Sequence, residues 1–133
     1  MNFASDVEEY ANSIGEDVNQ VLRSITLDLC ANVINETPVD EGTARNNWFS
    51  AVNRRPKGTR KADKEGSKAM AQLESEVEKF KMGDKFTMVN RTPYILALEY
   101  GHSDQARSPD GMLRKSVAKA EQFVKQGIQD ANR

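Results

Sequence analysis

The sequence contains few of the residues on which metal and redox chemistry depends, with one cysteine and one histidine among 133 residues. The single cysteine, Cys30, excludes an internal disulfide and a metal site built from several cysteines. It stands in an apolar helical stretch, so we expect a small buried side chain rather than a reactive thiol. The single histidine, His102, and the scattered carboxylates match the ligand spacing of no common metal site. We therefore expect neither a metal ion nor another cofactor.

Long apolar runs are also missing from the sequence. No run approaches the ~20 residues that a membrane-spanning helix requires. The N-terminal residues lack the basic start and the apolar centre of a signal peptide. We therefore expect a protein that is made in the cytoplasm and has no membrane partner.

The usual enzyme motifs are absent as well, since there is no glycine-rich phosphate loop, no nucleophile elbow and no Cys–His pair. An enzyme would have to be built from Asp40, Glu41, Glu99, His102 and Asp104. We expect His102 to serve a turn and Glu99 to form a structural ion pair with a base such as Arg45 or Arg91. The chain is therefore not expected to be an enzyme, and a metal-dependent hydrolase near His102 and Glu99 is the weakest alternative.

The composition that is present favours one domain spanning residues 1–133, with 38% hydrophobic and 29% charged residues. The net charge of −1 hides an uneven distribution. Residues 1–36 hold seven acidic side chains and one basic, whereas residues 54–64 hold six basic side chains and one acidic. Such asymmetry favours oriented contacts with other copies of the chain or with other proteins.

The N-terminal quarter has the apolar spacing of one long helix. A capping box at Ser5 begins it, and Pro38 ends it at Thr37. Such a helix would be ~48 Å long, whereas a compact domain of this size has a radius of gyration of only ~14 Å. We therefore expect the helix to overhang its domain, with its apolar stripe covered by the C-terminal helix or by another subunit.

The remaining pattern predicts an α+β fold. Residues 45–53 and 86–89 alternate as strands that pair antiparallel, with a helix over 65–81 inserted between them. Trp48 is expected to anchor the core. Two strands alone are marginal, so a third strand or pairing with a neighbour is required. The full prediction is a long N-terminal helix, a small antiparallel sheet, the inserted middle helix and a C-terminal helix packed on the sheet.

The segment that joins the first strand to the middle helix is strongly basic. Pro56 and Gly58 interrupt regular structure there, and the charges come from Arg54, Arg55, Lys57, Arg60 and Lys61. The segment is expected to be a solvated, mobile hairpin tip, a basic arm for an acidic partner, or a phosphate-binding site. No aromatic residue is interleaved with the charges, so base stacking is not supported.

Residues 89–112 read as an elbow between the sheet and the last helix. A strand end is followed by a turn at which Thr92 and Pro93 suit the N-cap and the first position of a short apolar helix, and Gly101 stops that helix. Tyr94 and Tyr100 lie at the two ends of the apolar stretch. An elbow with exposed aromatic rings is a candidate contact surface.

Three segments together resemble a known family. They are TPVDEGTARNNW at 37–48, PYILALEYGH at 93–102, and PDGML at 109–113, which opens the terminal helix. In order and spacing they resemble the head–tail joining or tail-completion proteins of long-tailed bacteriophages, a group that includes minor tail protein Z of lambda-like phages.

The resemblance implies a small α+β structural protein of the virion that forms a ring, commonly of six copies, at the head-proximal end of the tail. The ring would contact the tail tube or tail terminator protein and the head connector protein, and DNA would pass through it without sequence recognition. By matching position, the turn would be shaped by Asp40, Gly42 and Arg45, and the elbow by Trp48, Pro93, Tyr94, Glu99 and Gly101. These are structural or interface roles. The alternative from another class is a sequence-nonspecific nucleic-acid-binding module that uses residues 54–64.

Overall fold

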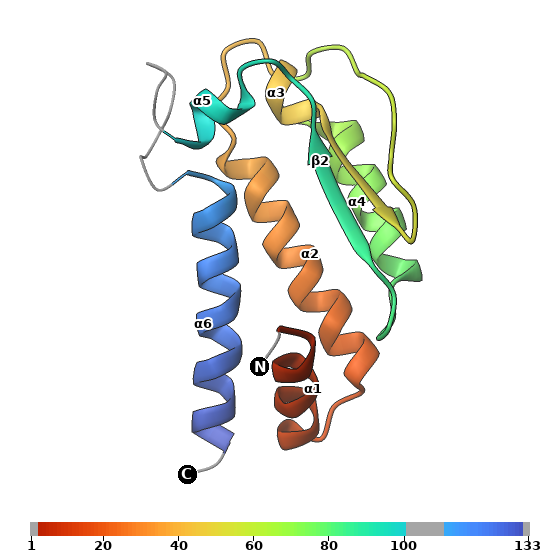
Figure 1. The fold of residues 1–133 in the computed structure, drawn as a ribbon, viewed down its shortest axis with the longest axis vertical. Helices are drawn as coiled ribbons and strands as arrows, with labels where there is room; N and C mark the ends of the chain where they lie inside the picture. Colours follow the sequence, from red (N-terminus) through yellow and green to blue (C-terminus); the bar gives the residue numbers. More distant parts are fainter. Residues whose placement is uncertain (1–2, 101–110, 132–133) are drawn as a thin grey trace.

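The computed structural model describes residues 3–100 and 111–131, which form helices and a two-stranded antiparallel sheet (Figure 1). The expected α+β class is confirmed. In chain order the elements are α1 Phe3–Ile14, α2 Val18–Glu36, α3 Thr43–Asn46, β1 Trp48–Val52, α4 Ser67–Lys79, β2 Phe86–Asn90, α5 Ile95–Glu99 and α6 Leu113–Ala131.

The single long N-terminal helix predicted from the sequence is wrong, because the chain breaks between α1 and α2. Gly15 has a φ of 72°, a left-handed conformation that ends α1. Asp17 then caps α2 by accepting a hydrogen bond from the Gln20 N–H at 2.9 Å. The expected overhang is therefore wrong as well.

The apolar stripe of α1 is covered by α6 within the same chain. Val7 and Ala11 are fully buried, and α1 packs against both α2 and α6 (Figure 1). The Tyr10 ring meets Phe123 edge-on, with 5.7 Å between centroids. A Cβ at Gly127 would lie 2.3 Å from the Tyr10 ring, so glycine permits this close approach. The sequence predicted that either the C-terminal helix or another subunit would cover this stripe, and the structure shows the C-terminal helix there.

The sheet confirms the predicted pairing of two strands around an inserted helix. Trp48 lies opposite Asn90, and Val52 lies opposite Phe86. The first strand is shorter than predicted because α3 takes up residues 43–46. α4 packs on β1, whereas the main contacts of α6 are with α1 and α2. Within the described ranges no third strand is present.

Trp48 anchors the larger of two hydrophobic clusters, as predicted. It is 4% exposed, and its indole N–H donates to the Thr37 hydroxyl at 2.8 Å. Cys30 is also buried in this cluster, and burial raises the pKa of its thiol to about 12. The thiol is therefore protonated at neutral pH and behaves as a small apolar side chain. None of the helices in the described ranges is long and apolar enough to cross a membrane.

Candidate protein interface

The elbow leaves β2 through a turn and enters a short helix, α5. The helix begins at Ile95, not at the Pro93 position that the sequence favoured. Thr92 does not cap it with its side chain, because the Thr92 hydroxyl donates to Asn90 Oδ1 at 2.7 Å. The Thr92 carbonyl instead accepts the Ile95 N–H at 3.2 Å. The turn is thereby fixed to the end of the sheet.

Glu99 joins the elbow to the start of α6. Its carboxylate accepts the backbone N–H groups of Met112, Leu113 and Arg114 at 3.0, 2.9 and 3.0 Å. The Arg114 side chain adds an ion pair, with Nε 3.0 Å from Glu99 Oε2. The structural ion pair predicted for Glu99 is therefore present, but its base is Arg114 and neither Arg45 nor Arg91. A carboxylate at this position satisfies free donors at the first turn of α6 and complements the helix dipole.

Glu99 stays ionised in this environment. Burial alone would raise the pKa of the Glu99 carboxyl, but the hydrogen bonds from Leu113, Arg114 and Met112 outweigh it and hold the pKa below its usual value. Gly111 has a φ of 76°, and a Cβ there would lie 2.4 Å from the Glu99 carboxyl carbon. Glycine therefore lets the two segments meet. Gly101, His102 and Asp104 lie outside the described residues.

Four large apolar side chains around this joint are exposed, and we call them the elbow patch. The exposed fractions are 43% for Tyr94, 69% for Leu96, 49% for Tyr100 and 41% for Leu113. Leu98 on the same short helix is buried and holds α5 to the core. The guanidinium of Arg114 lies over the Tyr100 ring, 4.4 Å from its centroid. The patch is thus presented by a backbone that is fixed from both sides.

Gly42 and Arg45 hold the turn that follows α2. Gly42 has a φ of 93°, and a Cβ there would lie 2.3 Å from the Asp63 backbone. Arg45 donates to the carbonyls of Asn35, Thr37 and Lys64 at 2.8, 3.1 and 2.8 Å. The turn therefore binds the end of the basic segment to the end of α2. Asp40 is exposed on the outside of this turn.

Arg60 is partly buried, so the basic segment is not a uniformly solvated tip. It donates to the carbonyls of Asn46 and Trp48 at 2.9 and 2.8 Å, and to Gln72 Oε1 at 2.9 Å. Its guanidinium also covers the Phe49 ring at 3.9 Å. Partial burial lowers the pKa of Arg60. These contacts give Arg60 a structural role at the edge of the sheet.

The other cations of the segment divide into paired and outward-facing groups. Arg54 forms an ion pair with Glu76 at 3.1 Å. Burial alone would raise the pKa of Glu76, but bonds from Lys79 and the Val52 N–H, with the Arg54 charge, hold it below its usual value. Arg55, Lys57 and Lys61 are exposed, and no acidic partner for them lies among the described residues. These three side chains, together with the exposed Lys64 at the end of the segment, are the ones available to an anionic partner.

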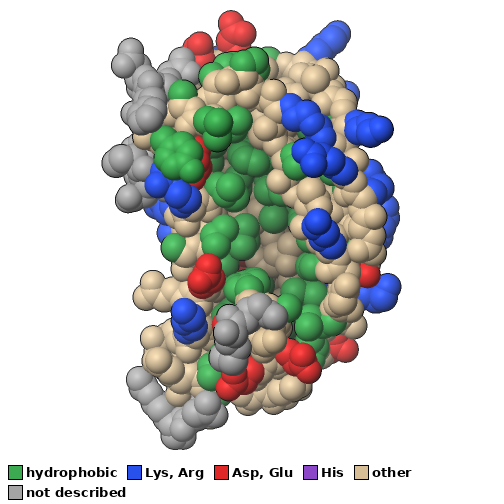
Figure 2. Space-filling view, viewed as in Figure 1, with side chains coloured by type: hydrophobic (Ala, Val, Ile, Leu, Met, Phe, Trp, Pro, Cys, Tyr) green, Lys and Arg blue, Asp and Glu red, His purple; other side chains and the backbone are tan. Residues whose placement is uncertain are grey.

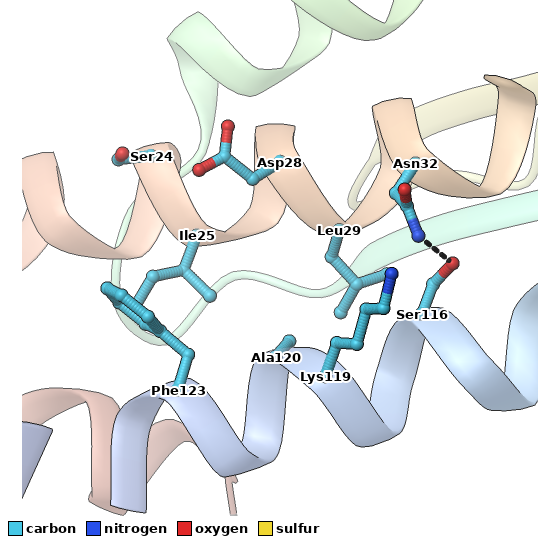
Figure 3. Close-up of a pocket in the computed structure, with 9 residues that line it drawn as sticks. All are labelled: Ser24, Ile25, Asp28, Leu29, Asn32, Ser116, Lys119, Ala120 and Phe123. Atoms are coloured by element: carbon cyan, nitrogen blue, oxygen red, sulfur yellow. Dashed lines mark hydrogen bonds between the residues drawn. The ribbon is translucent and has the colours of Figure 1, made fainter. Parts of the chain in front are cut away.

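A groove of about 330 Å³ runs between α2 and α6 (Figure 3). Ile25 and Leu29 point into it from α2, and Phe123 closes one end from α6. At the other end Asn32 donates to the Ser116 hydroxyl at 2.8 Å. The groove is mainly apolar and holds no set of groups arranged for acid–base or nucleophilic chemistry.

The structure does not bring the candidate catalytic residues together. Glu99 is fully engaged at the start of α6, whereas Asp40 and Glu41 are exposed at the turn after α2. In the described part of the chain no three acidic, cysteine or histidine side chains could hold a metal ion. Comparison with protein-family models, with curated proteins and with solved structures finds no match.

Three contributors to these surfaces were missed by sequence reasoning: Gln72, Glu76 and Arg114. Each is a polar side chain whose partner lies on another element. Glu76 follows Gln72 by four residues, which is one helical turn and therefore one face of α4. The spacing was the signal from which a shared role of Gln72 and Glu76 could have been predicted. Nothing in the sequence, however, shows that a strand edge lies against this face of α4.

Proposed function

We propose that this chain is a structural virion protein that forms a homo-oligomeric ring, with six copies expected, at the head-proximal end of a phage tail. The ring completes the tail, joins it to the head connector protein and leaves a channel for DNA. The family resemblance in residues 37–48 and 93–113 suggests this role. The function is one of assembly, with no reaction catalysed.

The elbow patch is the observation that carries the proposal. Leu96 is 69% exposed and stands beside two tyrosines that are each more than 40% exposed. Aromatic and large apolar side chains are enriched at protein interfaces, where rigid presentation limits the entropy lost on binding. Glu99 and buried Leu98 supply that rigidity. A stable contact between copies would bury ~800 Å² per partner, of which the patch would form the apolar centre.

Introducing a charge into the patch tests the proposal. Leu96→Asp should abolish ring formation, because it places a carboxylate at an apolar interface. Ile14→Asp is the matched control, since Ile14 is 43% exposed at the far end of α1. Native mass measurement should find rings for the wild type and for Ile14→Asp, and monomers for Leu96→Asp. Rings of unchanged mass in Leu96→Asp would refute the role of the patch.

A second candidate function, sequence-nonspecific nucleic-acid binding, is favoured by the exposed side chains of Arg55, Lys57 and Lys61. Three such contacts would give an affinity that weakens with salt, with a logarithmic slope of about −2 to −3. Replacing all three by glutamine should remove that slope if this function is correct. Titration of a duplex DNA at two salt concentrations separates the two functions, because the ring protein needs no affinity for free DNA.

A further inference from the structure

The two outer edges of the sheet differ in whether their backbone groups have hydrogen-bond partners. On the outer edge of β1, the Ser50 N–H donates to Gln72 Oε1 at 2.9 Å and the Val52 N–H donates to Glu76 Oε1 at 3.0 Å. The Trp48 carbonyl on that edge accepts from Arg60 at 2.8 Å. Side chains therefore occupy the positions that a neighbouring strand would use. β1 is closed to further pairing.

The outer edge of β2, formed by the backbone groups that face away from β1, is not paired in the part of the chain that the structure describes. Asn53 N–H donates to the Lys85 carbonyl at 2.8 Å, which places Lys85, Thr87 and Val89 in the hydrogen-bonded positions facing β1. The N–H and C=O groups of Phe86, Met88 and Asn90 consequently point away from β1. Among the described residues no group pairs with these backbone atoms. All five residues of β2 are only partly buried, whereas four of the five in β1 are buried.

The open edge lies beside an apolar hollow. Figure 2 shows hydrophobic side chains lining a depression over α2, between α6 and the sheet. Phe86 and Met88 are partly buried and pack against the hydrophobic clusters. A strand added to β2 would alternate its side chains between the hollow and solvent. Apolar residues at every second position would therefore fit it.

Charge decides which kind of strand fits. Lys85 and Arg91 flank β2 and are exposed, and Figure 2 shows further Lys and Arg side chains on the sheet side of the hollow. Antiparallel pairing of β2 with β2 of a second copy would set Lys85 against Arg91, and like charges across a strand pair are destabilising. The same two cations favour a strand with carboxylates at its ends.

We propose that the outer edge of β2 binds an extended segment of a partner protein as a third strand, with apolar side chains at alternate positions and acidic residues at both ends. Main-chain hydrogen bonds would supply affinity, and the hollow and the flanking cations would supply specificity. This goes beyond the proposed ring, which the elbow patch alone could build. The two claims concern different surfaces and can fail separately.

Amide hydrogen exchange of the full chain, followed by NMR, tests the proposal residue by residue. The probe is a blocked heptapeptide of alternating valine and threonine with glutamate at each end, a length that sets the two glutamates opposite Lys85 and Arg91. Without peptide, the amides of Phe86, Met88 and Asn90 should exchange at least about tenfold faster than those of Thr87 and Val89. Saturating peptide should slow the three fast amides by at least tenfold and leave the other two unchanged.

Two comparisons complete the experiment. A peptide with lysine at each end should bind roughly tenfold more weakly than the glutamate peptide, because each end pair changes from attractive to repulsive. The Lys85→Glu variant should reduce this preference. Unchanged exchange at the three amides under saturating peptide would overturn the proposal. Protection that rises with protein concentration in the absence of peptide would also overturn it, because a second copy would then occupy the edge.

Discussion

Replacing Glu99 by glutamine removes the charge that joins the elbow to α6 while keeping the shape of the side chain. Glu99 Oε1 accepts two N–H groups and Oε2 accepts two more, with all four distances between 2.9 and 3.0 Å. A glutamine amide can place an oxygen at only one of these sites, so its NH₂ group would face the donors of Met112 and Leu113 or of Arg114. In either orientation two N–H donors would then face another donor instead of an acceptor.

The size of the effect follows from these contacts. Loss of a helix N-cap costs ~0.5–2 kcal/mol, and a hydrogen bond to a charged group contributes ~1.5–3 kcal/mol. Because the remaining oxygen keeps half of the contacts, we expect Glu99→Gln to lower the free energy of unfolding by about 2 kcal/mol. That corresponds to a fall in Tm of roughly 7 °C for a chain of this size. Urea unfolding followed by circular dichroism measures the loss.

The pH dependence of this loss identifies the carboxylate as its source. The folded-state pKa of Glu99 lies below the usual 4.5. Its stabilisation is therefore fully present above pH ~5 and is lost as the pH falls through the folded-state pKa. The gap between wild type and Glu99→Gln should accordingly shrink below pH 4.5. Glu78→Gln, at an exposed position of α4, is the control. A loss below ~0.5 kcal/mol at pH 7, or a gap that does not vary with pH, would refute the reasoning.

Three further outcomes are expected. Trp48→Ala should lower the free energy of unfolding by ~3–5 kcal/mol, because it leaves a cavity in the core. Trp48→Phe should lower it by only about 1 kcal/mol, through loss of the hydrogen bond to Thr37. Near-equal losses for the two variants in urea unfolding would contradict this. Gly15→Ala should cost ~1 kcal/mol through its positive φ alone, since nothing lies within 4 Å of the added Cβ; an unchanged Tm would contradict it. Reversing the charges of Arg55, Lys57 and Lys61 together should impair ring assembly while Tm stays within about 2 °C; normal assembly and normal phage yield would exclude a role for these cations.

The α+β class and the pairing of the two strands were predictable, because alternation over 48–52 and 86–90 is a local signal. The break at Gly15 was missed because the local apolar signal does not change there. The apolar spacing continues on both sides of Gly15, so periodicity alone joins α1 and α2 into one rod. The left-handed glycine followed two residues later by the Asp17 cap carried the correct signal, a helix end and a helix start.

The partners of charged residues were not predictable from sequence. Glu99 pairs with Arg114 across the segment 101–110, and Arg60 turns inward to the sheet edge. Both choices depend on where separate elements meet in space. The elbow was identified correctly as a place of exposed aromatics, because a short helix can bury only one face and Leu98 occupies it. The closed edge of β1 could not be predicted, because it depends on where α4 lies in space, and sequence patterns do not give that position.

The proposed place of this chain in a phage tail is tested most directly by imaging purified tailed particles produced together with it. The account expects a ring of density between the tail tube and the head connector into which copies of this structure fit, with the elbow patch buried between neighbouring copies. Purified particles that lack the chain, or that carry it elsewhere with the elbow patch facing solvent, would contradict it.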